Sequence, residues 1–173
     1  MGIRIIMILL SVSLGFSGLA VQSGAQPPPQ RLVISASLFD KAVACIKSFE
    51  GWHHARHHPY IGYGHKLLPG EKLTCNLTEA QADSLLRSDL VKRCHTFRRF
   101  GKDALLLAVL SYNVGEYRLL GSDKIPKSSL VRKLESGNRD IYQEYISYCC
   151  YKGRRHAGLL KRRKTEFALF YIP

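Results

Sequence analysis

Acidic residues are scarce in this sequence. Its 173 residues include 13 Asp and Glu against 26 Lys and Arg, which gives a formal net charge of +13. A field of this sign attracts polyanions, whether nucleic acid, an acidic membrane surface or an acidic cell-wall polymer. The basic residues form short clusters such as Arg98-Arg99 and Arg154-Arg155, with no RNA-binding signature and no zinc-finger spacing. We therefore expect no nucleic acid among its partners.

Cysteine is also limited in number and position. No cysteine precedes Cys45, which excludes a lipid-modified cysteine near the N-terminus. The five cysteines suit neither a dense disulfide framework nor the paired spacing of a metal site, and their odd number leaves at least one unpaired. We expect most of them to be small buried hydrophobic residues, while one disulfide remains open. Adjacent Cys149 and Cys150 should point to different sides, so that one can be buried and the other exposed.

The N-terminal segment predicts export. Residues 1–25 combine one basic residue, Arg4, with an apolar run to about Val21 and small residues ending at Ala25, a pattern typical of a cleavable signal peptide. A retained membrane anchor is the alternative, because the run approaches the roughly 18 residues that span a bilayer. Cleavage after Ala25 removes one positive charge and leaves +12. The mature protein is then expected in the periplasm or outside the cell, without stable membrane association, and we expect a monomer.

Length and composition predict one folded domain. The apolar fraction is 46% and the charged fraction 23%, values that make disorder unlikely for a chain of this length. Residues 26–36 contain the motif QPPPQ and are expected to form a spacer, so that the domain covers residues 37–173.

Hydrophobic spacing and capping signals predict a mostly helical domain with one short hairpin. The first helix should begin at a Ser37 cap and end at Gly51, and glycines and aromatic residues in 59–73 indicate the hairpin. Thr78 and Gln81 form a capping box for the next helix. The remaining helices are expected at 78–93, 100–115 (buried and central), 128–137, 138–148 and 159–170.

Glu50 lies in the last turn of the first expected helix, beside core-facing Phe49. The negative end of the helix dipole and nearby apolar surface both disfavour an ionised carboxylate there. A carboxyl that keeps its proton near neutral pH can act as general acid toward a glycosidic oxygen. A solvated glutamate at a helix end is the plainer interpretation of the residue taken alone.

Four histidines follow Glu50 closely. His53 and His57 are four residues apart, as are His54 and His58, a spacing that would place each pair on one face of a helix within reach of a metal ion. A glycine and a proline bracket the run, which argues against a helix, and no HExxH arrangement exists. We expect a surface histidine patch with no metal, and we expect no cofactor. A zinc hydrolase built on these histidines is the alternative.

Six motifs together resemble the phage-type lysozymes, or endolysins. They occur in the order and approximate spacing of that family over about residues 37–170: KSFEG, YIGYGH, TEAQADSLLRSDL, LSYNVG, SSLVRKLESG and GLLKRRKTEFALF. The resemblance implies an α+β, mostly α, lysozyme-like fold of two lobes, with a small β-hairpin lobe, a larger helical lobe and a cleft between them. It also implies a muramidase whose partners are bacterial peptidoglycan glycan strands and which hydrolyses the β-1,4 bond between N-acetylmuramic acid and N-acetylglucosamine.

The resemblance also implies roles for individual residues. Glu50 matches the glutamic acid that protonates the leaving oxygen. The expected substrate-binding residues are Gly62, Gly64 and His65 in the IGxGH strand and Asn113 at the end of the central helix. The RRxxE motif of the last helix, Arg162, Arg163 and Glu166, is expected to be mainly structural.

The sequence departs from the family between Glu50 and the IGxGH strand. Members place an aspartate there, and a threonine directly before the strand, to hold and activate water, whereas this interval has no acidic residue and Tyr60 replaces the threonine. An inverting hydrolase requires a base for water besides its acid.

Three routes would repair this departure. In the first, His57 or His58 serves as the base and Tyr60 orients the water. In the second, the side chain of Glu71 moves toward Glu50 and serves as the second carboxylate. In the third, Glu50 acts alone as acid and base in a lytic transglycosylase. Our prediction is hydrolysis with Glu50, His58 and Tyr60 as catalytic residues. A non-catalytic peptidoglycan-binding derivative is a further alternative.

Overall fold

The computed structural model describes residues 34–173. The expected signal peptide, residues 1–25, and most of the expected spacer lie outside the described residues. The described chain consists of α-helices, two 3-10 helices (η) and two antiparallel hairpins: α1 Ala36–Glu50, η1 Ala55–His57, β1 Tyr60–Ile61, β2 His65–Lys66, α2 Glu79–Thr96, η2 Arg98–Asp103, α3 Ala104–Val114, α4 Tyr117–Leu120, α5 Ser129–Glu135, α6 Tyr142–Ile146, β3 Cys150–Tyr151, β4 Arg154–Arg155 and α7 Ala157–Phe170.

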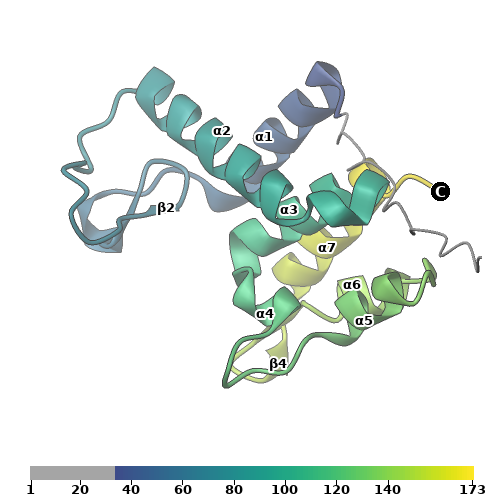
Figure 1. Cartoon of the computed structure of the whole chain (residues 1–173). Helices are drawn as coiled ribbons and strands as arrows, with labels where there is room; N and C mark the ends of the chain where they lie inside the picture. Colours follow the sequence, from purple (N-terminus) through teal and green to yellow (C-terminus); the bar gives the residue numbers. More distant parts are fainter. Residues whose placement is uncertain (1–33) are drawn as a thin grey trace, which may run out of the picture.

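These elements form two lobes connected by α2, as Figure 1 shows. The small lobe contains η1 and the β1–β2 hairpin, in which Ile61 pairs with His65. Helices α3 to α7 gather at the other end of α2 and form the helical lobe. The predicted fold class, mostly α with a small β-hairpin lobe, is confirmed. Among residues 34–173 no helix is both long enough and apolar enough to cross a membrane.

Helix α1 begins earlier than the sequence predicts. Its N-cap is Ser35, whose hydroxyl accepts a hydrogen bond from the Leu38 N–H at 3.2 Å, so the prediction of a Ser37 cap is wrong. With the cap at Ser35, Ile34 directly precedes the cap and Phe39 lies four positions after it, and both pack against the core. Two serines offered equivalent caps, and packing of the first turn distinguishes them. Helix α1 therefore includes Ala36, the last residue of the expected spacer.

The two central helices follow the sequence closely. The capping box of α2 is confirmed, because Thr78 and Gln81 each accept a hydrogen bond from the other's backbone N–H. Helix α3 is buried nearly all round and ends at Gly115, as predicted. It begins at Ala104 and not at Phe100, because the non-helical backbone of Gly101 breaks the expected helix and residues Arg98–Asp103 form η2. It packs against α1, α2 and α7 and forms the centre of the hydrophobic core. This core fixes the orientation of the helix ends that border the site.

The C-terminal third differs from the prediction in its short elements. Helix α6 covers only Tyr142–Ile146 of the helix expected over 138–148, because the Asn138 side chain accepts the Asp140 N–H and holds a turn before it. The sequence analysis also missed α4 and the β3–β4 hairpin. Elements this short carry too few periodic positions to be recognised from spacing.

All five cysteines are free, and their burial divides as expected. Cys45, Cys94 and Cys149 are buried, and burial raises the pKa of the first two thiols to about 11. Cys149 faces the core while its neighbour Cys150 is exposed. The prediction that the adjacent pair points to opposite sides is confirmed.

Candidate active site

Glu50 is the last residue of α1, at the point where the chain leaves the helical lobe. Gly51 follows with φ of 66°, a left-handed conformation that favours glycine, and its N–H donates to the Lys47 carbonyl. The side chain of Glu50 is 17% exposed. The carboxyl is thus mostly desolvated yet open on one side.

The glycine strand of the small lobe passes directly beside this carboxyl. A Cβ placed on Gly64 would lie 3.6 Å from Oε2 of Glu50 and 3.6 Å from the ring of Tyr112. Tyr112, on α3, donates its hydroxyl hydrogen to the Tyr63 carbonyl at 3.1 Å. Burial raises the pKa of Tyr112, so this hydroxyl remains a donor. Three elements, α1, the β1–β2 turn and α3, therefore meet at Glu50.

Arg162 of α7 forms an ion pair with Glu50. Its Nη1 lies 2.8 Å from Oε1 of Glu50, and its Nε lies 2.8 Å from Oε1 of Glu166. Burial disfavours the charge on Arg162, but Glu50 and Glu166 together outweigh burial and raise its pKa. One guanidinium therefore joins the carboxylates of Glu50 and Glu166.

The ion pair belongs to a buried network that extends to α3. Glu166 accepts hydrogen bonds from Arg163 at 3.1 Å and from the Tyr145 hydroxyl at 3.0 Å. Arg163 in turn donates to the side-chain oxygen of Asn113 at 3.2 Å. Burial lowers the pKa of Arg163 despite the nearby Glu166. The RRxxE motif thus connects the predicted acid, Glu50, to the predicted glycan-binding Asn113.

His65, predicted to bind substrate, has both ring nitrogens occupied within the protein. Nδ1 lies 2.5 Å from Asp89 and Nε2 lies 3.0 Å from Glu71, and the residue is only 6% exposed. The Leu68 N–H and His65 hold the pKa of Glu71 below its ordinary value. This arrangement fastens the β1–β2 hairpin to α2, and it keeps Glu71 away from Glu50.

The two other predicted catalytic residues lie on a different cavity. His58 and Tyr60 are exposed and line a pocket of about 290 Å³ with Leu73 and Cys75. Neither Glu50 nor Gly64 lines that pocket. The structure places Gly64 beside Glu50 and connects Asn113 to Glu50 only through the arginine network of α7, and no contact of His58 or Tyr60 with these residues is found among residues 34–173.

Two other histidines of the cluster have distinct environments. Nδ1 of His57 accepts a hydrogen bond from the His54 N–H at 2.9 Å, and Nε of Arg56 lies 3.4 Å from Nε2 of the same ring. Desolvation and the charge of Arg56 lower the pKa of His57. His53 pairs with Gly62 through its backbone, and within residues 34–173 its buried Nδ1 has no hydrogen-bond partner. Its ring lies 6.1 Å from that of Tyr60.

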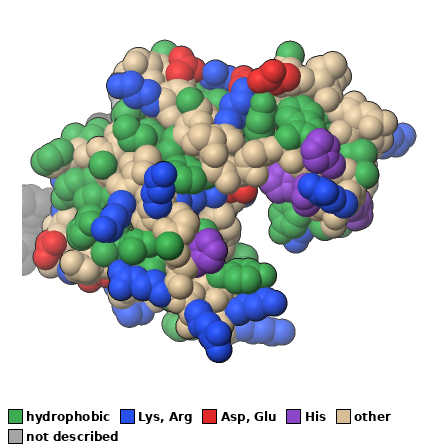
Figure 2. Space-filling model, turned by 180° about the vertical axis from the view of Figure 1, so that it is seen from behind, with side chains coloured by type: hydrophobic (Ala, Val, Ile, Leu, Met, Phe, Trp, Pro, Cys, Tyr) green, Lys and Arg blue, Asp and Glu red, His purple; other side chains and the backbone are tan. Residues whose placement is uncertain are grey.

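A hollow separates the lobes on the side of the molecule seen in Figure 2. The histidine side chains of the small lobe stand on one side of it, and Lys and Arg side chains gather on the other. On the helical side, Asn113 lines a cavity of about 750 Å³ together with Tyr117 and Tyr148. No group of three or more His, Cys, Asp or Glu in the part of the chain that the structure describes has the geometry of a metal site.

Comparison with known proteins identifies this arrangement. The family model described as phage lysozyme matches residues 47–166, a range that includes Glu50, the glycine strand and the RRxxE motif. The chain belongs to the phage lysozyme family. The structure is also similar to the muramidase domain of SpmX from Asticaccaulis excentricus, with 27% identity and a TM-score of 0.61, covering 83% of this chain and 100% of that domain. No curated protein sequence matches the chain.

Membership of the phage lysozyme family indicates a glycosidase-type enzyme with lysozyme-like activity on peptidoglycan. Two features of the site were not predicted from the sequence. Arg162 was assigned a mainly structural role, although it contacts Glu50 directly, and Tyr112 was not singled out. The adjacent Tyr112-Asn113 pair ahead of Gly115 was the available signal for Tyr112, since these residues share the end of one helix. Nothing in the sequence reports the contact between residues 50 and 162.

Proposed function

We propose that the protein is an exported muramidase that hydrolyses the β-1,4 bond between N-acetylmuramic acid and N-acetylglucosamine, with Glu50 as general acid. The observation that carries this proposal is the position of Glu50, whose partly exposed carboxyl lies between a glycine backbone and a buried arginine at the junction of the lobes. The bare strand at Gly64 leaves room for a sugar ring to approach the carboxyl.

Arg162 holds the proposed acid in place, because its Nη1 lies 2.8 Å from Oε1 of Glu50. A glycan strand lying over the open side of the carboxyl would remove its remaining water, and desolvation favours the neutral acid. Arg162 would then stay paired with Glu166, so that its charge is still balanced. The ion pair thus positions the carboxyl, and the substrate completes its activation.

An inverting mechanism also needs a base that activates water, and we propose His53 for this role. Its backbone is fixed to Gly62 of the strand that passes Glu50, and its buried Nδ1 lacks a partner in the described part of the chain. His57 is less suitable because Nδ1 already accepts a backbone N–H. His58, the sequence prediction, lines a separate cavity.

A lytic transglycosylase is the second candidate, and one observation favours it. Carboxylates of the small lobe and α2 each have other partners among residues 34–173: Glu71 and Asp89 bind His65, and Asp83 binds Lys47 and Arg87. None is paired with the site around Glu50. An enzyme without a second carboxylate can use Glu50 first as acid and then as base toward the C6 hydroxyl of the substrate, which yields a 1,6-anhydro sugar.

The test is mass spectrometry of the muropeptides that residues 26–173 release from purified peptidoglycan. Glu50→Gln, His53→Ala and His58→Ala are compared with wild type. We expect reducing-end products that disappear in Glu50→Gln, fall at least about a hundredfold in His53→Ala and persist in His58→Ala, since a general base contributes about 10² to 10⁴ in rate.

Other outcomes of these measurements would support one of the alternative functions. Anhydro products that depend on Glu50 and not on His53 establish the transglycosylase. Absence of products from wild type, with retained binding to the wall, replaces both enzymes with a non-catalytic binding module. Loss of activity with a chelator would support the zinc hydrolase, whereas the muramidase should be unaffected.

A further inference from the structure

The C-terminal segment carries a large excess of positive charge. Residues 146–173 contain seven Lys and Arg and a single acidic residue, Glu166, which is buried and bound to Arg162 and Arg163. The β3–β4 hairpin at the start of this segment bears Lys152, Arg154 and Arg155, all exposed. No carboxylate within residues 34–173 forms an ion pair with any of these three side chains.

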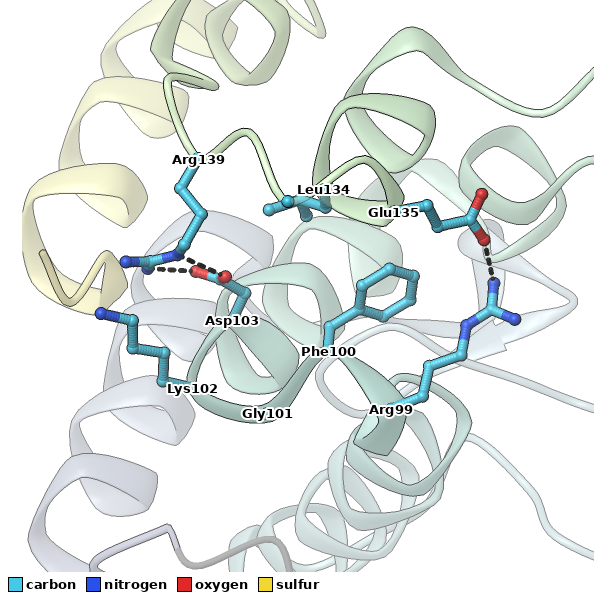
Figure 3. Close-up of a pocket in the computed structure, with 9 residues that line it drawn as sticks. Arg99, Phe100, Gly101, Lys102, Asp103, Leu134, Glu135 and Arg139 are labelled. Atoms are coloured by element: carbon cyan, nitrogen blue, oxygen red, sulfur yellow. Dashed lines mark hydrogen bonds and ion pairs between the residues drawn. The ribbon is translucent and has the colours of Figure 1, made fainter. Parts of the chain in front are cut away.

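Some basic residues elsewhere on the helical lobe are paired with carboxylates, as at a second cavity. This cavity, of about 510 Å³, lies between η2 and the α5–α6 turn. Arg139 donates two hydrogen bonds to Asp103, and Arg99 lies 2.8 Å from Glu135. Figure 3 shows these two ion pairs on opposite sides of Phe100. The hairpin differs from this surface because its cations have no carboxylate partner, and its charge is free to bind an external anion.

The geometry of the hairpin places cations on both of its faces. Side chains alternate along a strand, so Arg154 and Arg155 point to opposite faces. Arg154 pairs in register with Tyr151, which is 61% exposed, and Arg155 pairs with Cys150. Cavities of about 750 Å³ and about 440 Å³ lie along the hairpin, and both are lined by Tyr151 and Lys152.

The hairpin is also close to the glycan site without forming part of it. Lys152 and Asn113 line the same cavity of about 750 Å³, whereas Arg154 and Arg155 line only the smaller one. In Figure 2 Lys and Arg side chains gather beneath the hollow, on the part of the molecule that contains the hairpin in Figure 1. A ligand on the hairpin would therefore run beside a glycan strand in the cleft.

We propose that the β3–β4 hairpin is a second binding surface, which takes a linear, phosphate-bearing polymer of the bacterial envelope and holds the enzyme where that polymer runs beside peptidoglycan. The location beside peptidoglycan rests on the proposed function, but the binding does not. Arginine suits this ligand because its guanidinium presents several donors that match phosphate oxygens. A flexible polymer can contact both faces of the hairpin, whereas a flat membrane surface reaches only one arginine at a time.

The test measures binding of the purified protein to poly(glycerol phosphate) at several salt concentrations. The variant Arg154→Gln/Arg155→Gln is compared with Lys41→Gln/Lys72→Gln, which removes the same net charge from two exposed lysines of α1 and the small lobe. We expect the hairpin variant to bind about tenfold more weakly at 0.1 M salt. The slope of log K against log salt should fall by about 1.4, because each lost phosphate contact removes about 0.7. The control variant should bind as wild type does.

Three outcomes would overturn the proposal. Equal weakening in both variants would mean that net charge alone attracts the polymer. Tighter, hairpin-dependent binding to vesicles containing phosphatidylglycerol would assign the surface to a membrane, and the same result with single-stranded DNA would assign it to nucleic acid. Activity is measured separately on peptidoglycan stripped of anionic polymers, where both variants should equal wild type. Loss of activity in wild type there would refute the proposed function and leave the binding result intact.

Discussion

Glu166 provides the sharpest test of how the site is built. We expect Glu166→Gln to lower the free energy of unfolding by about 3 kcal/mol, because it removes charge while keeping the shape of the side chain. Glu166 is 1% exposed and lies between Arg162 and Arg163, which are 4% and 0% exposed. Removing one partner of a buried ion pair typically costs about 3–5 kcal/mol, since the other charge stays buried without compensation.

The lower end of that range follows from the geometry. The amide oxygen of Gln can still accept one arginine N–H, and Glu50 still balances part of the charge on Arg162. Nε and Nη1 of Arg163 already lack partners within the described residues, so this arginine has no alternative acceptor there. For a domain of this size, about 3 kcal/mol corresponds to a decrease in Tm of roughly 10 °C.

Urea denaturation followed by circular dichroism measures this loss, with Glu50→Gln as the matched control. Glu50 is 17% exposed, and Arg162 keeps its hydrogen bond to Glu166 when Glu50 is replaced, so this replacement should cost only about 1–1.5 kcal/mol. The double variant should be non-additive by at least about 0.5 kcal/mol, because both carboxylates share Arg162. A loss below about 1 kcal/mol in Glu166→Gln would refute the view that this network holds the site together.

Other predictions concern the small lobe, α2 and the cysteines. The Leu68 N–H and His65 hold the pKa of Glu71 below its ordinary value, so the ionised carboxylate stabilises the folded state. This stabilisation is complete above the unfolded pKa of about 4.3 and disappears as the pH falls through the lower folded pKa. The urea midpoint of Glu71→Gln should therefore decline less than that of wild type below about pH 4.5. Thr78→Ala should lower the free energy of unfolding by about 1 kcal/mol through loss of the N-cap, as measured by the same denaturation, and an unchanged midpoint would contradict the cap. Brief maleimide labelling of the native protein, followed by peptide mapping, should modify exposed Cys150 before the buried cysteine next to it; equal labelling would contradict their opposite orientation.

The long elements were predictable because local chemistry decides them. The capping box at Thr78 and the apolar run ending at Gly115 each require only neighbouring residues, and both appear where the sequence places them. The cap of α1 was predicted two residues late, because Ser35 and Ser37 are equivalent until the packing of the first turn is considered. The β3–β4 hairpin left no periodic signal, since each strand has two residues.

The candidate site also combines features that local sequence predicted with contacts that only the structure shows. Glu50 and the glycine strand were identified from motifs that lie close together in the chain. The contact between Glu50 and Arg162 joins residues 112 positions apart, and the burial of His65 between Asp89 and Glu71 depends on how the hairpin docks on α2. Long-range contacts of this kind depend on packing, which residue spacing does not report.

The sequence by itself determined the helical character, the lysozyme-like family and the position of Glu50, the proposed acid, at a helix end, because periodicity, caps and motif order are local properties. Only the tertiary structure decided which charge faces Glu50, which histidines stand apart from it and which arginines are left without a carboxylate. These features depend on the docking of α7 against α1 and α3, and on the folding back of the β3–β4 hairpin beside the cleft. Electrostatic function follows from distances between side chains, and those distances exist only after the helices have packed.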